Sequence, residues 1–418
     1  MYKDKIKNKI WNFQHKINTI FFPLMSKIFY FFPIKKNRIV VSSYHGKGFS
    51  DNPKFIIEEL LKKNKYLEVI WFVDKYLNEE DNLPPNIKKV QYYTMKSLYY
   101  LATACVWIDN CRKDYAPKKK KEQLYIQTWH GGIGFKNVEA KCKKDLSNFY
   151  LKHAILDAKM TDLMLSNSKK TSEIYREMFW YKGHILEAGL PRNDNFITNK
   201  NNSEEIKKKV KKDLMIEEDT KIILYAPTFR DQYNLKSYNL NLKKVCQTFS
   251  ECFGGKWISV FRLHPNIKAD YSNKNEFKES VDATKYLNSD FLLQAADVFI
   301  SDFSSMVFDF VINKKLVLLY ASDYEEYIAT RGVWLKYDMT IFPYAFSNDE
   351  MIKKIKDINM ENYIKDLEKM LSLFEIRETG KSAVSTAQII LKYLITFDLK
   401  KSLQMVSVEI DDKRHLLY

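Results

Sequence analysis

The chain contains, from Asp297 to Phe310, the stretch DVFISDFSSMVFDF, in which an apolar strand pattern leads through a hydroxyl-rich corner into a helical pattern. Such a corner gathers backbone N–H groups, the hydroxyls of Ser304 and Ser305 and the positive end of a helix dipole around one point. That arrangement suits a phosphate group. The alternative is a serine-capped helix in an ordinary α/β domain, since Ser and Asp are common cap residues.

Three other stretches also place polar residues directly after an apolar strand pattern. They are QTWHGG from Gln127 to Gly132, YAPTFRD from Tyr225 to Asp231 and FRLHP from Phe261 to Pro265. In open α/β sheets, ligands bind beyond the carboxyl ends of the strands. Four such corners in one chain favour a ligand site over four unrelated helix caps.

Strand patterns alternate with helical patterns along the chain, which is typical of parallel, doubly wound sheets. The strand patterns lie at 38–43, 68–73, 105–109, 124–128 and 162–166 in the first half, and at 221–226, 257–263, 297–301 and 316–320 in the second. A polar stretch from Asn193 to Glu204 is the expected linker, and helical patterns close the chain from Asp349 to Phe397. We therefore expect an N-terminal segment 1–36, an α/β domain 37–200 that binds the acceptor, and an α/β domain 201–418 that binds the donor and includes the closing helices.

Six motifs, in this order, resemble those of the CDP-glycerol glycerophosphotransferase family, whose members build teichoic-acid and related poly(polyol phosphate) chains. They are WHGG at 129–132 with Phe135 and Lys136 downstream, GLPRND at 189–194, LYAPTFRD at 224–231, RLHP at 262–265, SDFSS at 301–305, and Tyr327 with Arg331 and Gly332. The resemblance runs from about Ser42 to about Lys381, which is most of the chain. It departs at Gly132-Ile133-Gly134, where the family has Thr-Pro-Leu, and this departure leaves the acceptor open.

The resemblance implies a GT-B-like fold, in which two Rossmann-like domains face each other across a cleft. It also implies transfer of glycerol phosphate from CDP-glycerol to a hydroxyl of a lipid-linked or polysaccharide acceptor, with release of CMP, in teichoic-acid or capsule synthesis. One alternative is the same fold with CDP-ribitol or another nucleotide-activated donor. Another is a non-catalytic, membrane-associated scaffold.

This transfer needs a base near the acceptor and cationic or N–H groups around the diphosphate. Histidine suits the base because its pKa lies near neutrality. The resemblance implies roles for His130, the expected base, and for His264 at the donor phosphate, although either could be a structural histidine. The expected donor- and phosphate-binding residues are Arg192, Arg230, Arg262, Asp302, Ser304, Ser305 and Asp309, and the expected acceptor loop contains Gly131, Gly132 and Lys136. No residue spacing calls for a metal or an organic cofactor.

Much of the net charge of +16 comes from the N-terminal segment, where residues 1–38 contain nine Lys or Arg and one acid, Asp4. Apolar residues recur there at three- and four-residue intervals, at Ile6, Ile10, Phe13, Ile17, Phe21, Leu24, Ile28 and Phe31. This pattern predicts a basic amphipathic helix. We expect it to attach the protein peripherally to the anionic inner leaflet of the cell membrane, since Pro23 and Pro33 interrupt any spanning segment. The alternative is that the stripe packs on the protein itself or on a partner.

The cysteines and the lysine runs indicate the cellular environment and the class of partner. The five cysteines include no Cys-x-x-Cys pair, which favours a reduced, cytosolic environment over a disulfide framework. The lysine runs at 118–121 and 207–212 are not part of a recognisable nucleic-acid module, so we expect no nucleic-acid partner.

Overall fold

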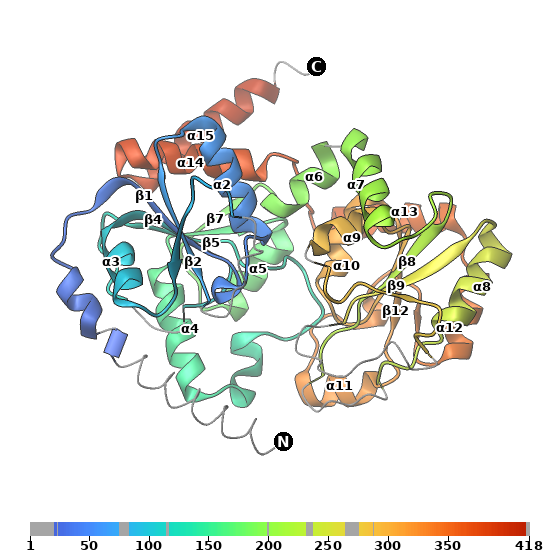
Figure 1. Ribbon diagram of the computed structural model, residues 1–418. Helices are drawn as coiled ribbons and strands as arrows, with labels where there is room; N and C mark the ends of the chain where they lie inside the picture. The colour runs from blue at the N-terminus through green and yellow to red at the C-terminus, as the bar shows by residue number, and fades with distance from the viewer. Residues whose placement is uncertain are drawn as a thin grey trace. The chain divides into compact units, whose positions relative to one another are not determined.

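The computed structural model describes residues 21–22, 24–74, 83–113, 117–198, 200–230, 237–263, 276–286 and 288–414, and it divides into two compact units (Figure 1). The first unit contains residues 1–130, 139–194 and 377–418, and the second contains residues 131–138 and 195–376. Each unit is built on one parallel sheet. The prediction of two doubly wound α/β domains is therefore confirmed.

The first unit has a seven-stranded sheet with the order β3-β2-β1-β4-β5-β6-β7. Its strands are β1 (Lys35–Ser42), β2 (Glu68–Val73), β3 (Lys88–Gln91), β4 (Ala104–Asp109), β5 (Leu124–Gln127), β6 (Leu163–Ser166) and β7 (His184–Glu187). Its α-helices include α2 (Asp51–Lys63), α3 (Met95–Thr103), α4 (Asn148–Met160), α5 (Lys169–Met178), α14 (Ser382–Thr396) and α15 (Leu399–Arg414). All neighbouring strands run parallel, so their carboxyl ends meet at one edge.

Helices cover both faces of this sheet because successive strand residues point to opposite sides. In β1, Ile39 and Val41 belong to the same core as Ile56 of α2, whereas Val40 belongs to the core that contains Leu98 of α3. Strand β2 divides in the same way, with Trp71 on the α2 side and its neighbours on the α3 side. The continuous apolar runs in the sequence are therefore strands that are buried on both faces.

The second unit has a six-stranded parallel sheet with the order β10-β9-β8-β11-β12-β13. Its strands are β8 (Lys221–Tyr225), β9 (Trp257–Phe261), β10 (Val281–Asp282), β11 (Val298–Ser301), β12 (Leu316–Tyr320) and β13 (Tyr344–Ala345). Its α-helices include α7 (Lys200–Asp213), α8 (Leu242–Phe253), α9 (Ser289–Ala295), α10 (Met306–Phe310), α11 (Tyr324–Arg331), α12 (Asn348–Lys356) and α13 (Met360–Leu373). Helix α6 (Asp194–Thr198) starts where the chain leaves the first unit.

The sequence patterns missed four strands, and all four lie at sheet edges: β3, β7, β10 and β13. Strand β3 reads KKVQ and buries only Val90, while β10 and β13 have two residues each. Edge strands are often short and less completely buried than central strands, so they lack the continuous apolar run that reveals a central strand.

The observed division of the chain differs from the expected limits 37–200 and 201–418 in two places. The closing helices α14 and α15 belong to the first unit, because Ile389 and Ile390 share a core with Ile57 and Leu60 of α2. The segment 131–138, expected in the first domain, belongs to the second unit: its Ile133 and Phe135 are fully buried in that unit's core. Both differences arise from packing between residues far apart in the sequence.

Most of the predicted amphipathic segment, residues 1–20 together with Pro23, lies outside the described residues. Residues 24–29 are helical. Within the part of the chain that the structure describes, no helix has both the length and the hydropathy needed to cross a membrane.

The position of α14 in the first unit can be tested by Ile390→Ala. Ile390 is fully buried, so removing its side chain should cost about 2–5 kcal/mol of unfolding free energy, through lost burial and a cavity. Urea unfolding followed by circular dichroism measures the effect. Ile395 on the same helix is 80% exposed and provides the matched control, since Ile395→Ala should leave the midpoint almost unchanged. Equal effects of the two substitutions would contradict the assigned packing of α14.

Candidate functional site

His130 lies just beyond the carboxyl end of β5 in the first unit. Its Nδ1 is 2.7 Å from the backbone carbonyl oxygen of Asn110, and its ring stacks on Trp129 with centroids 4.4 Å apart. A carbonyl oxygen only accepts hydrogen bonds, so Nδ1 carries the proton and donates it. Nε2 of the neutral ring then carries the lone pair, which is the form that can accept a proton from a substrate.

The surroundings of His130 favour the neutral ring. Burial lowers its pKa below the usual value of histidine, and the hydrogen bond to Asn110 and the charge of Asp51 offset only part of this effect. The nearby cation of Arg192 lowers the pKa further. The ring is therefore uncharged at neutral pH, as a general base must be.

Arg192, expected at the donor phosphate, lies in the first unit next to His130. Its Nη1 donates to Asp51 Oδ1 at 3.0 Å and to the backbone oxygen of His130 at 2.9 Å. Its backbone N–H donates to the side chain of Asn52 at 3.1 Å. These contacts hold the loop that carries His130, so the structure gives Arg192 partners within the protein where the sequence suggested a phosphate.

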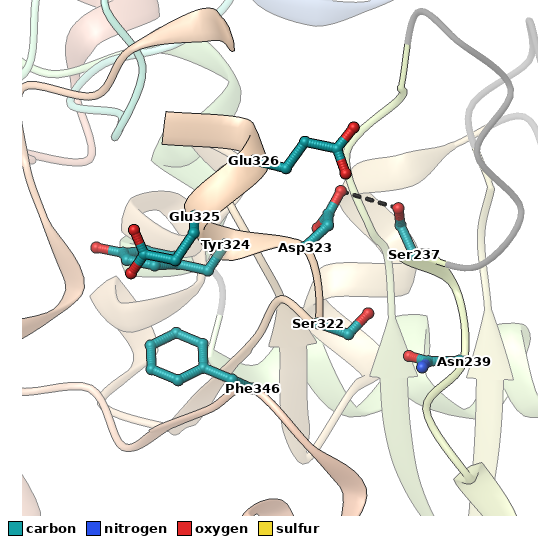
Figure 2. A pocket seen from close by; sticks show the side chains of 8 residues that line it. All are labelled: Ser237, Asn239, Ser322, Asp323, Tyr324, Glu325, Glu326 and Phe346. Carbon is teal, nitrogen blue, oxygen red and sulfur yellow. Dashed lines mark hydrogen bonds between the residues drawn. The ribbon is translucent and has the colours of Figure 1, made fainter. Parts of the chain in front are cut away.

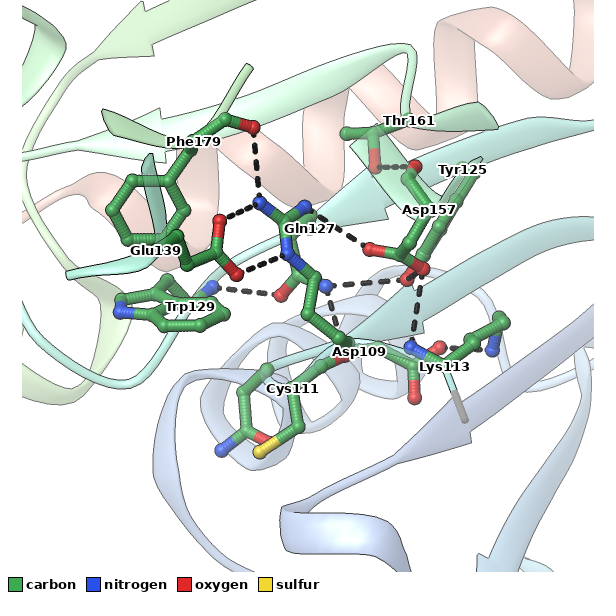
Figure 3. A network of polar contacts seen from close by, with 12 residues as sticks. Asp109, Cys111, Lys113, Tyr125, Gln127, Trp129, Glu139, Asp157, Thr161 and Phe179 are labelled. Carbon is green, nitrogen blue, oxygen red and sulfur yellow. Dashed lines mark hydrogen bonds and ion pairs between the residues drawn. The ribbon is translucent and has the colours of Figure 1, made fainter. Parts of the chain in front are cut away.

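A buried network of polar contacts also holds the loop that carries His130 (Figure 3). Arg112 donates to both oxygens of Glu139 at 2.9 and 2.7 Å, and to Asp157 at 3.2 Å. Figure 3 also shows Gln127, whose side chain accepts from the N–H of Trp129 at 3.0 Å and donates to the carbonyl of Cys111 at 2.9 Å. Gln127 thus joins the residues that follow Asn110 and precede His130.

Sequence reasoning missed several of these residues. Asn110 follows strand β4 directly, so the rule that pointed to the other polar corners could have found it. Asp51 begins α2 after Ser50 and looks like an ordinary cap residue, while Arg112 has no recognisable motif. Their roles depend on partners far along the chain.

In the second unit, Arg230 and Asp302 form a buried ion pair with an Nη2–Oδ2 distance of 2.9 Å. Arg230 also donates to both oxygens of Asp323 at 2.6 and 2.9 Å, and to the carbonyl of Thr228 at 2.7 Å. Asp302 Oδ1 accepts from the N–H groups of Thr228 and Phe303 at 2.8 and 2.7 Å. These two expected phosphate- or ribose-binding side chains therefore tie together the corners after β8 and β11.

The SDFSS corner lies against the segment that follows His130. A Cβ atom built on Gly131 would lie 2.8 Å from Ser305 Oγ, and one on Gly134 would lie 3.4 Å from Ser305 Cβ. The helix after the corner, α10, has only five residues. Its dipole is correspondingly small, so a phosphate here would depend mainly on the hydroxyls of Ser304 and Ser305.

The other expected site residues are placed as follows. Arg262 donates to the backbone carbonyls of Ala283 and Tyr286 next to β9, and Asp309 is buried in α10. Lys136 pairs with Val333 in an antiparallel bridge, and Gly132 is half-buried. His264 lies outside the described residues, so its role stays a prediction.

A surface pocket of about 500 Å³ opens beside β12 in the second unit (Figure 2). It is lined by Ser237, Asn239, Ser322, Asp323, Tyr324, Glu325, Glu326 and Phe346. Asp323 faces Ser237, which donates to it at 2.8 Å. Among the described residues, no group of three His, Cys, Asp or Glu side chains is placed to hold a metal ion.

Comparison with known proteins places these features in a family. The profile of the CDP-glycerol:poly(glycerophosphate) glycerophosphotransferases matches residues 24–392. The chain is 32% identical over 334 residues to a teichoic acid poly(glycerol phosphate) polymerase of Bacillus spizizenii, covering 78% of this chain and 83% of that protein. It is 28% identical over 408 residues to a teichoic acid glycerol-phosphate transferase of Staphylococcus aureus, covering 94% and 100%.

The fold is similar to that of the wall teichoic acid polymerase TagF. The TM-score is 0.75 at 24% identity, and the match covers 93% of this chain and 98% of the other. This likeness supports the expected Rossmann-like topology of each unit.

A structural role for Asp302 predicts a large loss of stability in Asp302→Ala. The substitution leaves the buried cation of Arg230 with one carboxylate fewer and removes the acceptor of two backbone N–H groups, which should cost about 3–5 kcal/mol. Chemical unfolding measures the loss. Glu279→Ala, which breaks the exposed pair with Lys243, is the control and should leave the midpoint nearly unchanged. Unaltered stability in Asp302→Ala would point instead to a ligand contact.

Proposed function

Since the chain belongs to the CDP-glycerol:poly(glycerophosphate) glycerophosphotransferase family, we propose that its donor is CDP-glycerol and its acceptor a hydroxyl of a lipid-linked or polysaccharide chain. Membership makes the protein a glycerophosphotransferase, and its relatives act in teichoic-acid synthesis. The observation that carries the proposal is the geometry of His130, whose Nδ1 is held by the carbonyl of Asn110.

The proposed reaction is a displacement at the β-phosphorus of the donor. The acceptor oxygen forms a bond to this phosphorus while the bond to the oxygen of the leaving CMP breaks. Nε2 of His130 takes the proton of the acceptor hydroxyl. A neutral ring that is already held as the Nδ1-protonated tautomer can accept this proton without reorganising, which is the advantage of a fixed general base.

The corner at Ser304 and Ser305 is our candidate for the donor phosphates, together with Arg262 and His264. Support comes from Gly131, which follows His130 in the chain and lies against Ser305. A glycine at this position leaves room beside the serine hydroxyl that any larger residue would take. Arg230 and Asp302 would then contribute by holding the corner in place.

Replacement of the proposed base should abolish most of the activity. With His130→Ala, we expect turnover with CDP-glycerol to fall by about 100-fold or more while donor affinity is kept, because the lost group acts on the acceptor proton. The assay follows CMP release with a lipid-linked glycerol-phosphate acceptor. The same assay with CDP-ribitol and nucleotide sugars tests the proposed donor.

The matched control is His184→Ala, since His184 is an exposed histidine on β7 of the same unit. It should retain normal turnover. Normal turnover in His130→Ala would remove this residue from the mechanism, and a faster reaction with CDP-ribitol than with CDP-glycerol would overturn the donor assignment.

The end of the predicted apolar stripe supports our proposal that the protein acts at the membrane surface. Four of its residues are described, and all are exposed: Phe21 at 43%, Leu24 at 54%, Ile28 at 56% and Phe31 at 86%. The opposite side of the same stretch, with Phe22 and Ser26, is buried at 4% each. This favours attachment of the exposed side to the anionic cytoplasmic face of the membrane, assisted by exposed lysines such as Lys27.

The membrane proposal is tested by the triple substitution Leu24→Ser, Ile28→Ser, Phe31→Ser. It should sharply reduce co-sedimentation with phosphatidylglycerol vesicles, because it removes the apolar part of the attachment. High salt should weaken binding of the unsubstituted protein without abolishing it, since charges are screened over about 8 Å at physiological ionic strength.

The control for this experiment is the pair Met215→Ser and Leu373→Ser, which are 94% and 81% exposed in the second unit. Their removal should not change sedimentation. If the triple variant sediments as fully as the unsubstituted protein, the stripe is not the membrane contact.

A further inference from the structure

We infer that Asp51, Asn110 and Arg192 are positioning residues that hold His130 with its Nδ1 protonated and its Nε2 directed to accept the proton of the acceptor. This inference rests on the proposed function of His130 as the base, and it gives that base a supporting set of residues. Asp51 and Asn110 were not among the expected site residues, whereas Arg192 was expected at the donor phosphate and is now assigned to support of the base.

The first argument is a closed ring of hydrogen bonds through His130. The imidazole donates to the backbone oxygen of Asn110 at 2.7 Å, and the side-chain amide of Asn110 donates to Asp51 Oδ2 at 2.6 Å. Arg192 donates to Asp51 Oδ1 at 3.0 Å and to the backbone oxygen of His130 at 2.9 Å. The ring therefore fixes both the side chain and the main chain of His130.

The second argument is that the side-chain oxygen and the side-chain amide of Asn110 both form hydrogen bonds. Its side-chain oxygen accepts from the N–H of Tyr44 at 2.8 Å, while its amide is engaged by Asp51. Asn110 is 1% exposed, so any rotation would leave buried polar groups without partners. The carbonyl that selects the tautomer of His130 is thus held in one direction.

The third argument is the backbone around the ring of hydrogen bonds. Tyr44, His45, Asp51 and Trp129 all have positive φ, at 46°, 58°, 58° and 53°. Non-glycine residues seldom adopt this conformation, and such residues gather at functional sites where the surroundings hold them. Four of them near one histidine indicate that the loops are shaped for its placement.

The fourth argument is electrostatic. Although burial alone would raise the pKa of Asp51, the charge of Arg192 and the hydroxyl of Tyr44 lower it, so Asp51 stays ionised. The groups that face His130 are Asp51, Arg192, His45, Tyr44 and Cys111. Asp51 favours the protonated ring and Arg192 opposes it, so the ion pair holds the charge near His130 almost balanced.

Because Asp51 and Arg192 act on the pKa of His130 in opposite directions, the inference predicts pKa shifts of opposite sign when each of them is replaced. Asp51→Asn is nearly isosteric and removes the anion, so the pKa of His130 should fall and the acid limb of the kcat/KM profile should move to lower pH. Arg192→Gln removes the cation, so the pKa should rise and the limb should move to higher pH. In both variants kcat should fall by about 10- to 100-fold from misplacement of the base, with the KM for CDP-glycerol unchanged.

Two further variants separate positioning from folding. Arg192→Lys keeps the charge, but the ammonium on its shorter side chain does not reach the position of Nη1, which donates to both Asp51 and His130, so its acid limb should stay in place while kcat remains reduced. Arg38→Gln breaks another arginine–carboxylate pair of the same unit, between β1 and Glu68 at the start of β2, and should leave the pH profile unchanged. Circular dichroism confirms that each variant is folded.

A direct measurement does not depend on the proposed reaction. In protein labelled with ¹⁵N-histidine, the signal of His130, identified by its loss in His130→Gln, should show Nδ1 protonated and Nε2 unprotonated in the neutral form. A neutral ring protonated at Nε2, or pKa shifts of the same sign in Asp51→Asn and Arg192→Gln, would overturn the inference. Full activity of His130→Gln would instead overturn the proposed function, while the ¹⁵N signal would still decide how His130 is held.

Discussion

Buried arginine–carboxylate pairs hold several of the described corners at the carboxyl ends of the strands. Arg112, Arg192 and Arg230 have side chains that are 4%, 9% and 7% exposed, and each pairs with one or two carboxylates. Removing a charged pair from water is costly, so such pairs persist only with close contacts and satisfied hydrogen bonds. The planar guanidinium meets this condition because it binds carboxylates and backbone carbonyls at once. These described corners are therefore held by contacts within the protein itself.

Buried arginines also hold the residues on both sides of the segment 131–138. Arg192 holds the backbone of His130 immediately before the segment, and Arg112 holds Glu139 immediately after it. Within the second unit, Ile133 and Phe135 are buried, and Asn137 donates to the carbonyl of Gly332 at 3.1 Å. Gly332 has φ +69°, a backbone conformation that residues with a side chain seldom adopt, so glycine suits this position. A loop that looks glycine-rich and adaptable in the sequence is in fact restrained at both ends and along its length.

The central strands, the two α/β domains and the family could be predicted from the sequence because they depend on local patterns and motif order. The roles of the arginines could not, because Arg192 and its partner Asp51 are 141 residues apart, and Arg230 and Asp323 are 93 apart. An arginine in a motif looks the same whether it meets a phosphate or a carboxylate. The position of α14 was missed for the same reason, since an apolar helical face does not identify the sheet it covers. The orientation of His130 depends on a backbone carbonyl, which leaves no trace in residue identity.

The structure shows where the residues of the altered stretch Gly132-Ile133-Gly134 lie. Ile133 is fully buried in the core of the second unit, so its side chain cannot contact an acceptor. Gly132 and Gly134 have no side chain to offer. A Cβ on Gly134 would make only ordinary van der Waals contact with Ser305, at 3.4 Å, so this position does not require glycine for space. The altered stretch therefore fills the core of the second unit with Ile133 and presents no other side chain.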